Sequence, residues 1–221
     1  MFATYLRLGY EHLLDLQGAD HILFIVVLCA GYALARWREL LVLITAFTVG
    51  HSVSLALATI GAVRVDSAWV EFLIPVTILA TAVLNVFETG PDDGDGAKAH
   101  PPGDRDPEAG NETPHPAKAR SRSGSSALLL YLLATGFGLI HGLGFSGFLR
   151  LLLGDEGSLL VPLLAFNVGL ELAQIVVALA ALGAAWILVR VGLPHRWWTR
   201  AVSLAIGAAA LFMSVERWPF P

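Results

Sequence analysis

Long, nearly continuous apolar runs alternate with short polar breaks along this chain. Six runs approach or exceed the roughly 17 to 25 residues that a helix needs to cross a bilayer, and they cover residues 19–35, 40–60, 68–87, 127–153, 159–189 and 198–215. Hydrophobic residues make up 56% of the chain and charged residues 14%. The pattern predicts an all-α polytopic membrane protein with about six transmembrane helices.

Two segments depart from the apolar pattern. Residues 89–126 are rich in Pro, Gly, Ser and charged residues and lack the apolar side chains that a folded core requires, which predicts a disordered linker. Residues 1–17 lack the apolar core of a cleavable signal peptide and mix Leu and Tyr with charges, as amphipathic surface helices do. The expected parts are an amphipathic N-terminal segment (1–17), helices one to three (18–88), the linker (89–126) and helices four to six (127–221).

The distribution of positive charge predicts the orientation in the membrane. Of the 14 Lys and Arg residues, ten lie in the connections that follow the first, third and fifth predicted helices, on one side of the membrane. The other four lie on the opposite side. Positive residues favour the cytoplasm. We therefore expect both termini outside and the linker in the cytoplasm.

Several ionisable residues lie where hydrocarbon would disfavour them by at least about 2.5 kcal/mol each. They lie in or beside the apolar runs and trace a path from the outer mouth to mid-membrane. Imidazole and carboxylate groups without a thiolate suit borderline divalent ions such as nickel, cobalt or zinc. The sequence therefore predicts these metal ligands: Asp20, His21, His51, Glu71, His141 and Glu171.

Other polar residues are predicted to support this site. Asn167 and Gln174 share one helix face with Glu171, at positions i, i+7 and i+4. Ser52, beside His51, and His12, in the N-terminal segment, complete the supporting set. Interhelical hydrogen bonding is the alternative explanation for the amide and hydroxyl groups, but it accounts poorly for three histidines inside the membrane.

The two halves of the chain share a short motif. Phe47-Thr48-Val49-Gly50 recurs as Phe166-Asn167-Val168-Gly169, and a histidine precedes each Phe, by 26 residues at His21 and by 25 at His141. Three helices per half would give the halves opposite topology. The pattern is therefore compatible with a 3+3 inverted repeat, in which transporters place substrate between the halves.

Motifs in five of the six runs and in the N-terminal segment carry a resemblance to a known family. They are Gly9-x-x-His12, Gly18-Ala19-Asp20-His21-Ile22-Leu23-Phe24, Phe47-Thr48-x-Gly50-His51-Ser52, Val70-Glu71, Phe137-Gly138-Leu139-Ile140-His141-Gly142-Leu143-Gly144-Phe145 and Phe166-Asn167-x-Gly169-x-Glu171-x-x-Gln174. Together they resemble the HupE/UreJ family of small bacterial membrane proteins. The resemblance implies a nickel or cobalt permease of the bacterial inner (cytoplasmic) membrane. Its partners would be the lipid bilayer and the metal substrate, without nucleic acid, and a homo-oligomer stays open.

Two function classes follow from these residues. The first is a transporter that moves a divalent metal, most simply nickel or cobalt, through the histidine and carboxylate site. The second is a zinc-dependent intramembrane hydrolase, because three histidines can hold zinc with an activated water. No His-Glu-x-x-His motif supports the second class, so we favour the transporter.

Overall fold

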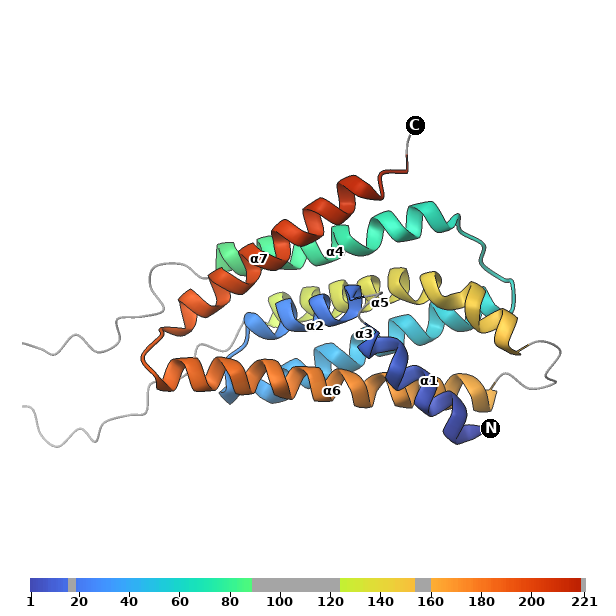
Figure 1. Ribbon diagram of the computed structural model, residues 1–221, viewed down its shortest axis with the longest axis horizontal. Helices are drawn as coiled ribbons and strands as arrows, with labels where there is room; N and C mark the ends of the chain where they lie inside the picture. Colours follow the sequence, from blue (N-terminus) through green and yellow to red (C-terminus); the bar gives the residue numbers. More distant parts are fainter. Residues whose placement is uncertain (16–18, 89–123, 154–159, 220–221) are drawn as a thin grey trace, which may run out of the picture.

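The computed structural model describes residues 1–15, 19–88, 124–153 and 160–219, and these residues form helices and connections without strands. Each apolar run predicted from the sequence corresponds to one helix. The helices are α1 (Phe2–Leu14), α2 (Asp20–Ala30), α3 (Trp37–Thr59), α4 (Ser67–Glu88), α5 (Gly124–Leu153), α6 (Leu160–Arg190) and α7 (His195–Glu216), with a 3₁₀ turn, η2 (Leu34–Arg36), before α3 (Figure 1).

Four helices in the described part of the chain are long and apolar enough to cross a membrane: α3 together with η2, α4, α6 and α7. The chain is thus an α-helical membrane protein. Helix α5 has 30 residues, whereas α2 has 11 and is about 16 Å long, half the thickness of a bilayer core. The count of six spans therefore stays a prediction.

The long helices lie side by side along the long axis of the molecule. Figure 1 shows the N-terminus, the α3–α4 connection and the end of α7 at one end of the bundle. The α2–α3 and α6–α7 connections lie at the other end, together with the end of α4 and the start of α5. Most of the predicted linker lies outside the described residues, but its last residues, 124–126, begin α5.

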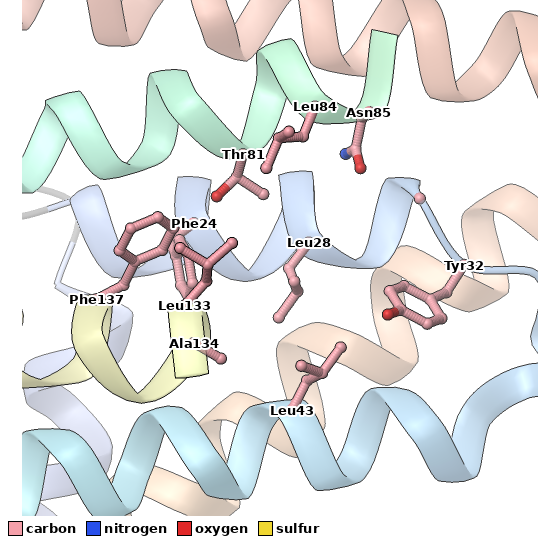
Figure 2. Close-up of a pocket in the computed structure, with 11 residues that line it drawn as sticks. Phe24, Leu28, Tyr32, Leu43, Thr81, Leu84, Asn85, Leu133, Ala134 and Phe137 are labelled. Carbon is pink, nitrogen blue, oxygen red and sulfur yellow. The ribbon is translucent and has the colours of Figure 1, made fainter. Parts of the chain in front are cut away.

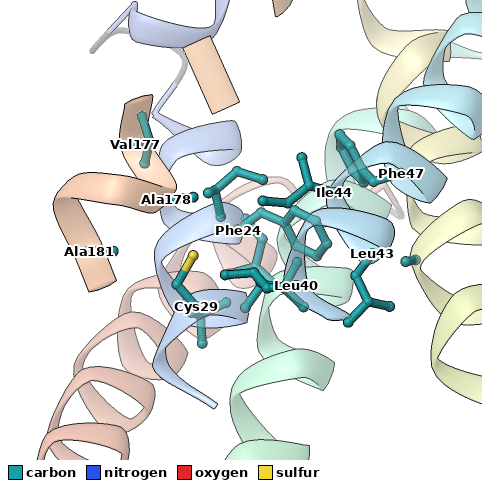
Figure 3. Close-up of a cluster of buried hydrophobic side chains, with 14 of the residues drawn as sticks. Phe24, Cys29, Leu40, Leu43, Ile44, Phe47, Val177, Ala178 and Ala181 are labelled. Atoms are coloured by element: carbon teal, nitrogen blue, oxygen red, sulfur yellow. The ribbon is translucent and has the colours of Figure 1, made fainter. Parts of the chain in front are cut away.

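Helix α2 is buried at the centre of the bundle. All but three of its 11 residues are buried, as expected of a helix that is apolar on every side. It packs against α6, α4 and α7, and Figure 3 shows Phe24 and Cys29 of α2 between α3 side chains and the Val177 to Ala181 segment of α6. The short helix therefore depends on the long ones for its position.

Glycines allow α3 and α5 to approach until their backbones touch. A β-carbon on Gly138 of α5 would collide with the carbonyl oxygen of Phe47, and one on Gly50 of α3 would collide with that of Thr135. A β-carbon on Gly142 would collide with the backbone of His51. Small residues commonly permit such close approach between membrane helices.

The pair formed by α1 and α6 is built in the same way. A β-carbon on Gly9 of α1 would collide with the carbonyl oxygen of Phe166, and one on Gly169 of α6 would collide with that of Leu6. The N-terminal segment is thus a helix whose apolar face packs on α6, while Arg7 and Glu11 form an exposed ion pair at 2.7 Å. The location of α1 on the membrane surface stays a prediction.

The backbone contact between α3 and α5 yields a stability prediction. Gly138→Ala should destabilise the protein by about 1 to 3 kcal/mol, because the added methyl group overpacks a site with no free space. Gly136→Ala, on the same helix with nothing near the added β-carbon, is the matched control. Thermal unfolding in detergent should show a lower Tm for the first variant only, and equal Tm values would contradict the close packing.

Candidate metal site

Four histidines from four different helices meet inside the bundle. They are His12 of α1, His21 of α2, His51 of α3 and His141 of α5. The imidazole rings of His12 and His141 each lie 5.0 Å from that of His21, and the ring of His51 lies 5.9 Å from it. One nitrogen each from His12, His21 and His51 lie within 4.8 Å of one another. We call these four residues the histidine cluster.

The glycine contacts place three of these side chains. His141 follows Gly138 by three residues on α5, and His12 follows Gly9 by three residues on α1, so each histidine lies one turn beyond a backbone contact. His51 directly follows Gly50 on α3. His21 comes from the first turn of α2, whose amide dipoles place partial positive charge beside the cluster, and Asp20 in the same turn offsets it.

The histidine cluster contains buried nitrogen atoms without a hydrogen-bond partner in the described protein. His51 and His141 are 0% and 1% exposed. Asn167 lies close enough to interact with His51 but not at hydrogen-bond geometry. An unpaired buried polar group costs about 1 to 3 kcal/mol, which a shared metal ion would offset. The unpaired atoms are Nε2 of His12, Nε2 of His21, both ring nitrogens of His51 and Nδ1 of His141.

The donor set suits a metal ion. Metal–imidazole bonds of about 2.1 Å keep two nitrogens on one ion no more than roughly 4.2 Å apart, so side-chain rotations that shorten the observed separations of up to 4.8 Å would bring these nitrogens within reach of one ion. Burial, followed by the charge of a protonated His21, lowers the pKa of His12 to about 3. His12 is therefore neutral at physiological pH and keeps a lone pair for a metal.

His141 has a neighbour that fixes its ring. The Thr77 hydroxyl donates to the carbonyl oxygen of Ile74 at 2.7 Å, and its oxygen lies 3.2 Å from Nε2 of His141. Since the hydroxyl proton is already engaged, Nε2–H of His141 donates to Thr77 and Nδ1 is left as the ligand atom. Such a partner on the far nitrogen is typical of metal-binding histidines.

Phenylalanines surround the histidine cluster. Phe145 lies 3.9 Å from the ring of His12 and stacks on Phe166 at 5.0 Å. Phe47 lies 5.1 Å from His141. These apolar walls lower the local dielectric and exclude water, which strengthens metal–ligand electrostatics.

The structure places the predicted carboxylates outside this cluster. Asp20 is buried next to His21 in the chain, and its Oδ2 accepts a hydrogen bond at 3.1 Å from Arg217, the residue directly after α7, while Oδ1 has no partner among the described residues. Glu71 is exposed and lines a separate cavity of about 270 Å³ with Arg64, between the α3–α4 connection and α5.

The remaining predicted residues belong to the contact between α3 and α6 or to their own helices. Glu171 accepts a hydrogen bond from Thr45 at 2.8 Å, and Gln174 accepts one from Thr48 at 2.7 Å. Ser52 donates to the Thr48 carbonyl, at 2.7 Å. Asn167 donates to the carbonyl of Leu163 on its own helix at 2.8 Å. The hydrogen-bonding explanation thus accounts for these groups, and Glu171 as a metal ligand stays a prediction that this placement does not support.

The sequence predicts a supporting role for His12, and the structure places it within the histidine cluster. It is as close to His21 as His141 is. A signal was present, because Gly9-x-x-His12 repeats the Gly138-x-x-His141 spacing. The short length of α1 obscured it.

The fold and the cluster define an α-helical membrane protein with a buried, histidine-lined candidate metal site. A family model described as HupE / UreJ protein matches residues 1–94 and 117–220. The chain belongs to the HupE/UreJ family, which is associated with nickel and cobalt transport. No curated protein and no solved structure matches the chain.

The geometry of the cluster predicts that His12 contributes as much to metal affinity as the other histidines of the cluster do. His12→Ala should lower the affinity for Ni²⁺ or Co²⁺ at least about tenfold, because one metal ligand is lost. His51→Ala and His141→Ala should have the same effect. Isothermal titration of the purified protein measures this. His195→Ala, which removes a histidine outside the cluster, is the control and should bind normally.

Proposed function

We propose that the protein transports a divalent transition metal, nickel or cobalt, through the histidine cluster. The observation that carries the proposal is the convergence of three buried imidazoles and the half-buried one of His12, each with at least one buried nitrogen that lacks a hydrogen-bond partner among the described residues. Purely structural packing would leave these groups unsatisfied at a considerable cost. Zinc fits the same donors, so the ion is identified by measurement rather than by geometry.

A cluster of neutral ligands supports transport rather than storage. Imidazole nitrogens bind nickel and cobalt well enough to replace bound water. Without a carboxylate in contact, two positive charges stay uncompensated in a low-dielectric site, which limits the affinity. Transport requires binding that is strong enough to dehydrate the ion and weak enough to release it.

Carboxylates at one end of the bundle support an outer access route. Asp20 lies beside the cluster, and Glu71 lines the 270 Å³ cavity at the end that holds both termini. Arg217 donates a hydrogen bond to Asp20, so a divalent cation would compete with the guanidinium for this carboxylate. With both termini outside, as the charge distribution predicts, this is the outer face of the bacterial inner membrane.

The two glycine-packed helix pairs support an inverted repeat. Phe47 faces His141 at 5.1 Å in one pair, and Phe166 faces His12 at 5.7 Å in the other. His21 lies at 5.0 Å from both histidines. Helices α3 and α5 run in one direction and α1 and α6 in the opposite one (Figure 1). We therefore pair His141 with His12, in place of the pairing with His21 that sequence spacing suggested.

The zinc hydrolase is the weaker candidate. It requires a general base within about 3 Å of a metal-bound water. Among the described residues, Glu171 is engaged with Thr45, Glu71 is exposed in the separate cavity, and Ser52 donates to its own helix. None of these groups approaches the cluster closely in this conformation.

Metal flux tests the proposed function. Proteoliposomes with the wild-type protein should accumulate Ni²⁺ or Co²⁺, and His51→Ala should lower the initial rate at least about tenfold, because the ligand set is incomplete. Glu171→Gln should transport normally, since it lies outside the cluster. An inert wild-type protein that instead cleaves amide or ester substrates with zinc would favour the hydrolase.

The orientation has its own test. Protease added to inside-out membrane vesicles should cut residues 89–126, because ten of the 14 positive residues assign that side to the cytoplasm. Right-side-out vesicles should protect the segment. Cleavage from the outside would reverse the proposed direction of access.

A further inference from the structure

Helix α4 carries a buried polar stripe that leads away from the histidine cluster. Thr77, Thr81 and Asn85 recur every four residues, which places them on one face, and they are 4%, 8% and 9% exposed. Thr77 lies against His141, and Asn85 donates to the carbonyl of Val27 near the end of α2 at 2.6 Å. The stripe thus extends about 12 Å from the cluster toward the end of the bundle opposite the termini.

A small cavity lies along this stripe. Its volume is about 40 Å³, enough for roughly three water molecules. Figure 2 shows Thr81 and Asn85 of α4 on one side, Phe24 and Phe137 at one end and Tyr32 at the other. Polar groups of α4 therefore face a space that α2, α3 and α5 otherwise line with apolar side chains.

An aromatic layer separates this cavity from the histidine cluster. Phe24 stacks on Phe47 at 4.8 Å and meets the edge of Phe137 at 6.1 Å. Phe24 also lies 5.5 Å from His141 and lines the cavity, so its ring is a shared wall. Apolar constrictions of this kind can close a permeation path.

The stripe offers weaker ligands than the cluster does. Thr81 donates its hydroxyl proton to the carbonyl oxygen of Thr77 at 3.0 Å, and a hydroxyl oxygen keeps lone pairs for a cation or its water. Oxygen ligands hold nickel and cobalt less strongly than imidazole nitrogen. An ion moving along the stripe would exchange imidazoles for hydroxyl oxygen and water.

We propose that the Thr77–Thr81–Asn85 stripe and its cavity form the inner release path for the metal, and that Phe24, Phe47 and Phe137 form its closed gate. This inference rests on the transport function proposed above. It assigns to α4 a role in the rate of release that is separate from metal binding by the cluster.

Thr81→Val is the central test, since it removes the hydroxyl with little change in shape. Ni²⁺ uptake into proteoliposomes should fall about tenfold, while the equilibrium Kd for Ni²⁺ of the purified protein stays within twofold. Thr59→Val is the matched control: Thr59 is also buried and donates to its own helix, to Leu55 at 2.7 Å, but it does not line the cavity.

Phe137→Ala tests the aromatic gate, and here metal movement should become faster rather than slower. Removing this ring opens the layer, so vesicles preloaded with Ni²⁺ should lose it faster than those with the wild-type protein. Equal uptake by Thr81→Val and Thr59→Val, or an unchanged leak through Phe137→Ala, would overturn the release path. So would a Thr81→Val protein that loses metal binding together with uptake. In each case wild-type uptake that depends on His51 would leave the proposed function standing.

Discussion

The contact of helix backbones at glycine controls the geometry of this protein. Helices usually pack with axes 8 to 10 Å apart, a distance set by the side chains between them. At Gly138 and Gly50 there is no side chain to separate α3 from α5, and Gly9 and Gly169 do the same for α1 and α6. His51, next to one of these contacts, and His12 and His141, one turn beyond theirs, consequently come close together. In a bilayer, where apolar burial does not favour one helix contact over lipid, such close packing stabilises the assembly.

The separation of charge from the buried ligands limits the cost of burying the histidine cluster. Neutral imidazoles are much less costly in hydrocarbon than carboxylates, and the cluster consists of imidazoles only. The three predicted carboxylates are each held elsewhere: Asp20 by Arg217, Glu171 by Thr45 and Glu71 at an exposed position. The site therefore gains a large charge only when a cation binds.

Helix positions could be predicted from the sequence because apolar runs of membrane length are a strong signal. The family resemblance and the presence of His21, His51 and His141 in one site followed from ionisable residues inside those runs. The inclusion of His12 in the histidine cluster and the position of Glu171 outside it depend on which helices touch. The periodicity of apolar residues does not determine these contacts. The α4 stripe was missed since threonine commonly bonds to its own helix and gives no sign of facing a cavity.

The order of donors along the bundle has an energetic consequence for the proposed direction. Glu71 lies toward the end that holds both termini, Asp20 lies beside the imidazoles in the middle, and hydroxyl and amide groups lie beyond them, so attraction of the ion decreases toward the opposite end, which is the inner one in the proposed orientation. A negative interior potential pulls the ion inward and would offset this loss of attraction, at about 2.3 kcal/mol per charge for 100 mV. A divalent cation would thus gain about 4.6 kcal/mol, equivalent to accumulation by about three orders of magnitude. In the proposed orientation, a potential of this size would suffice to drive uptake by the proposed transporter, whose task would be to lower the cost of dehydration on the way.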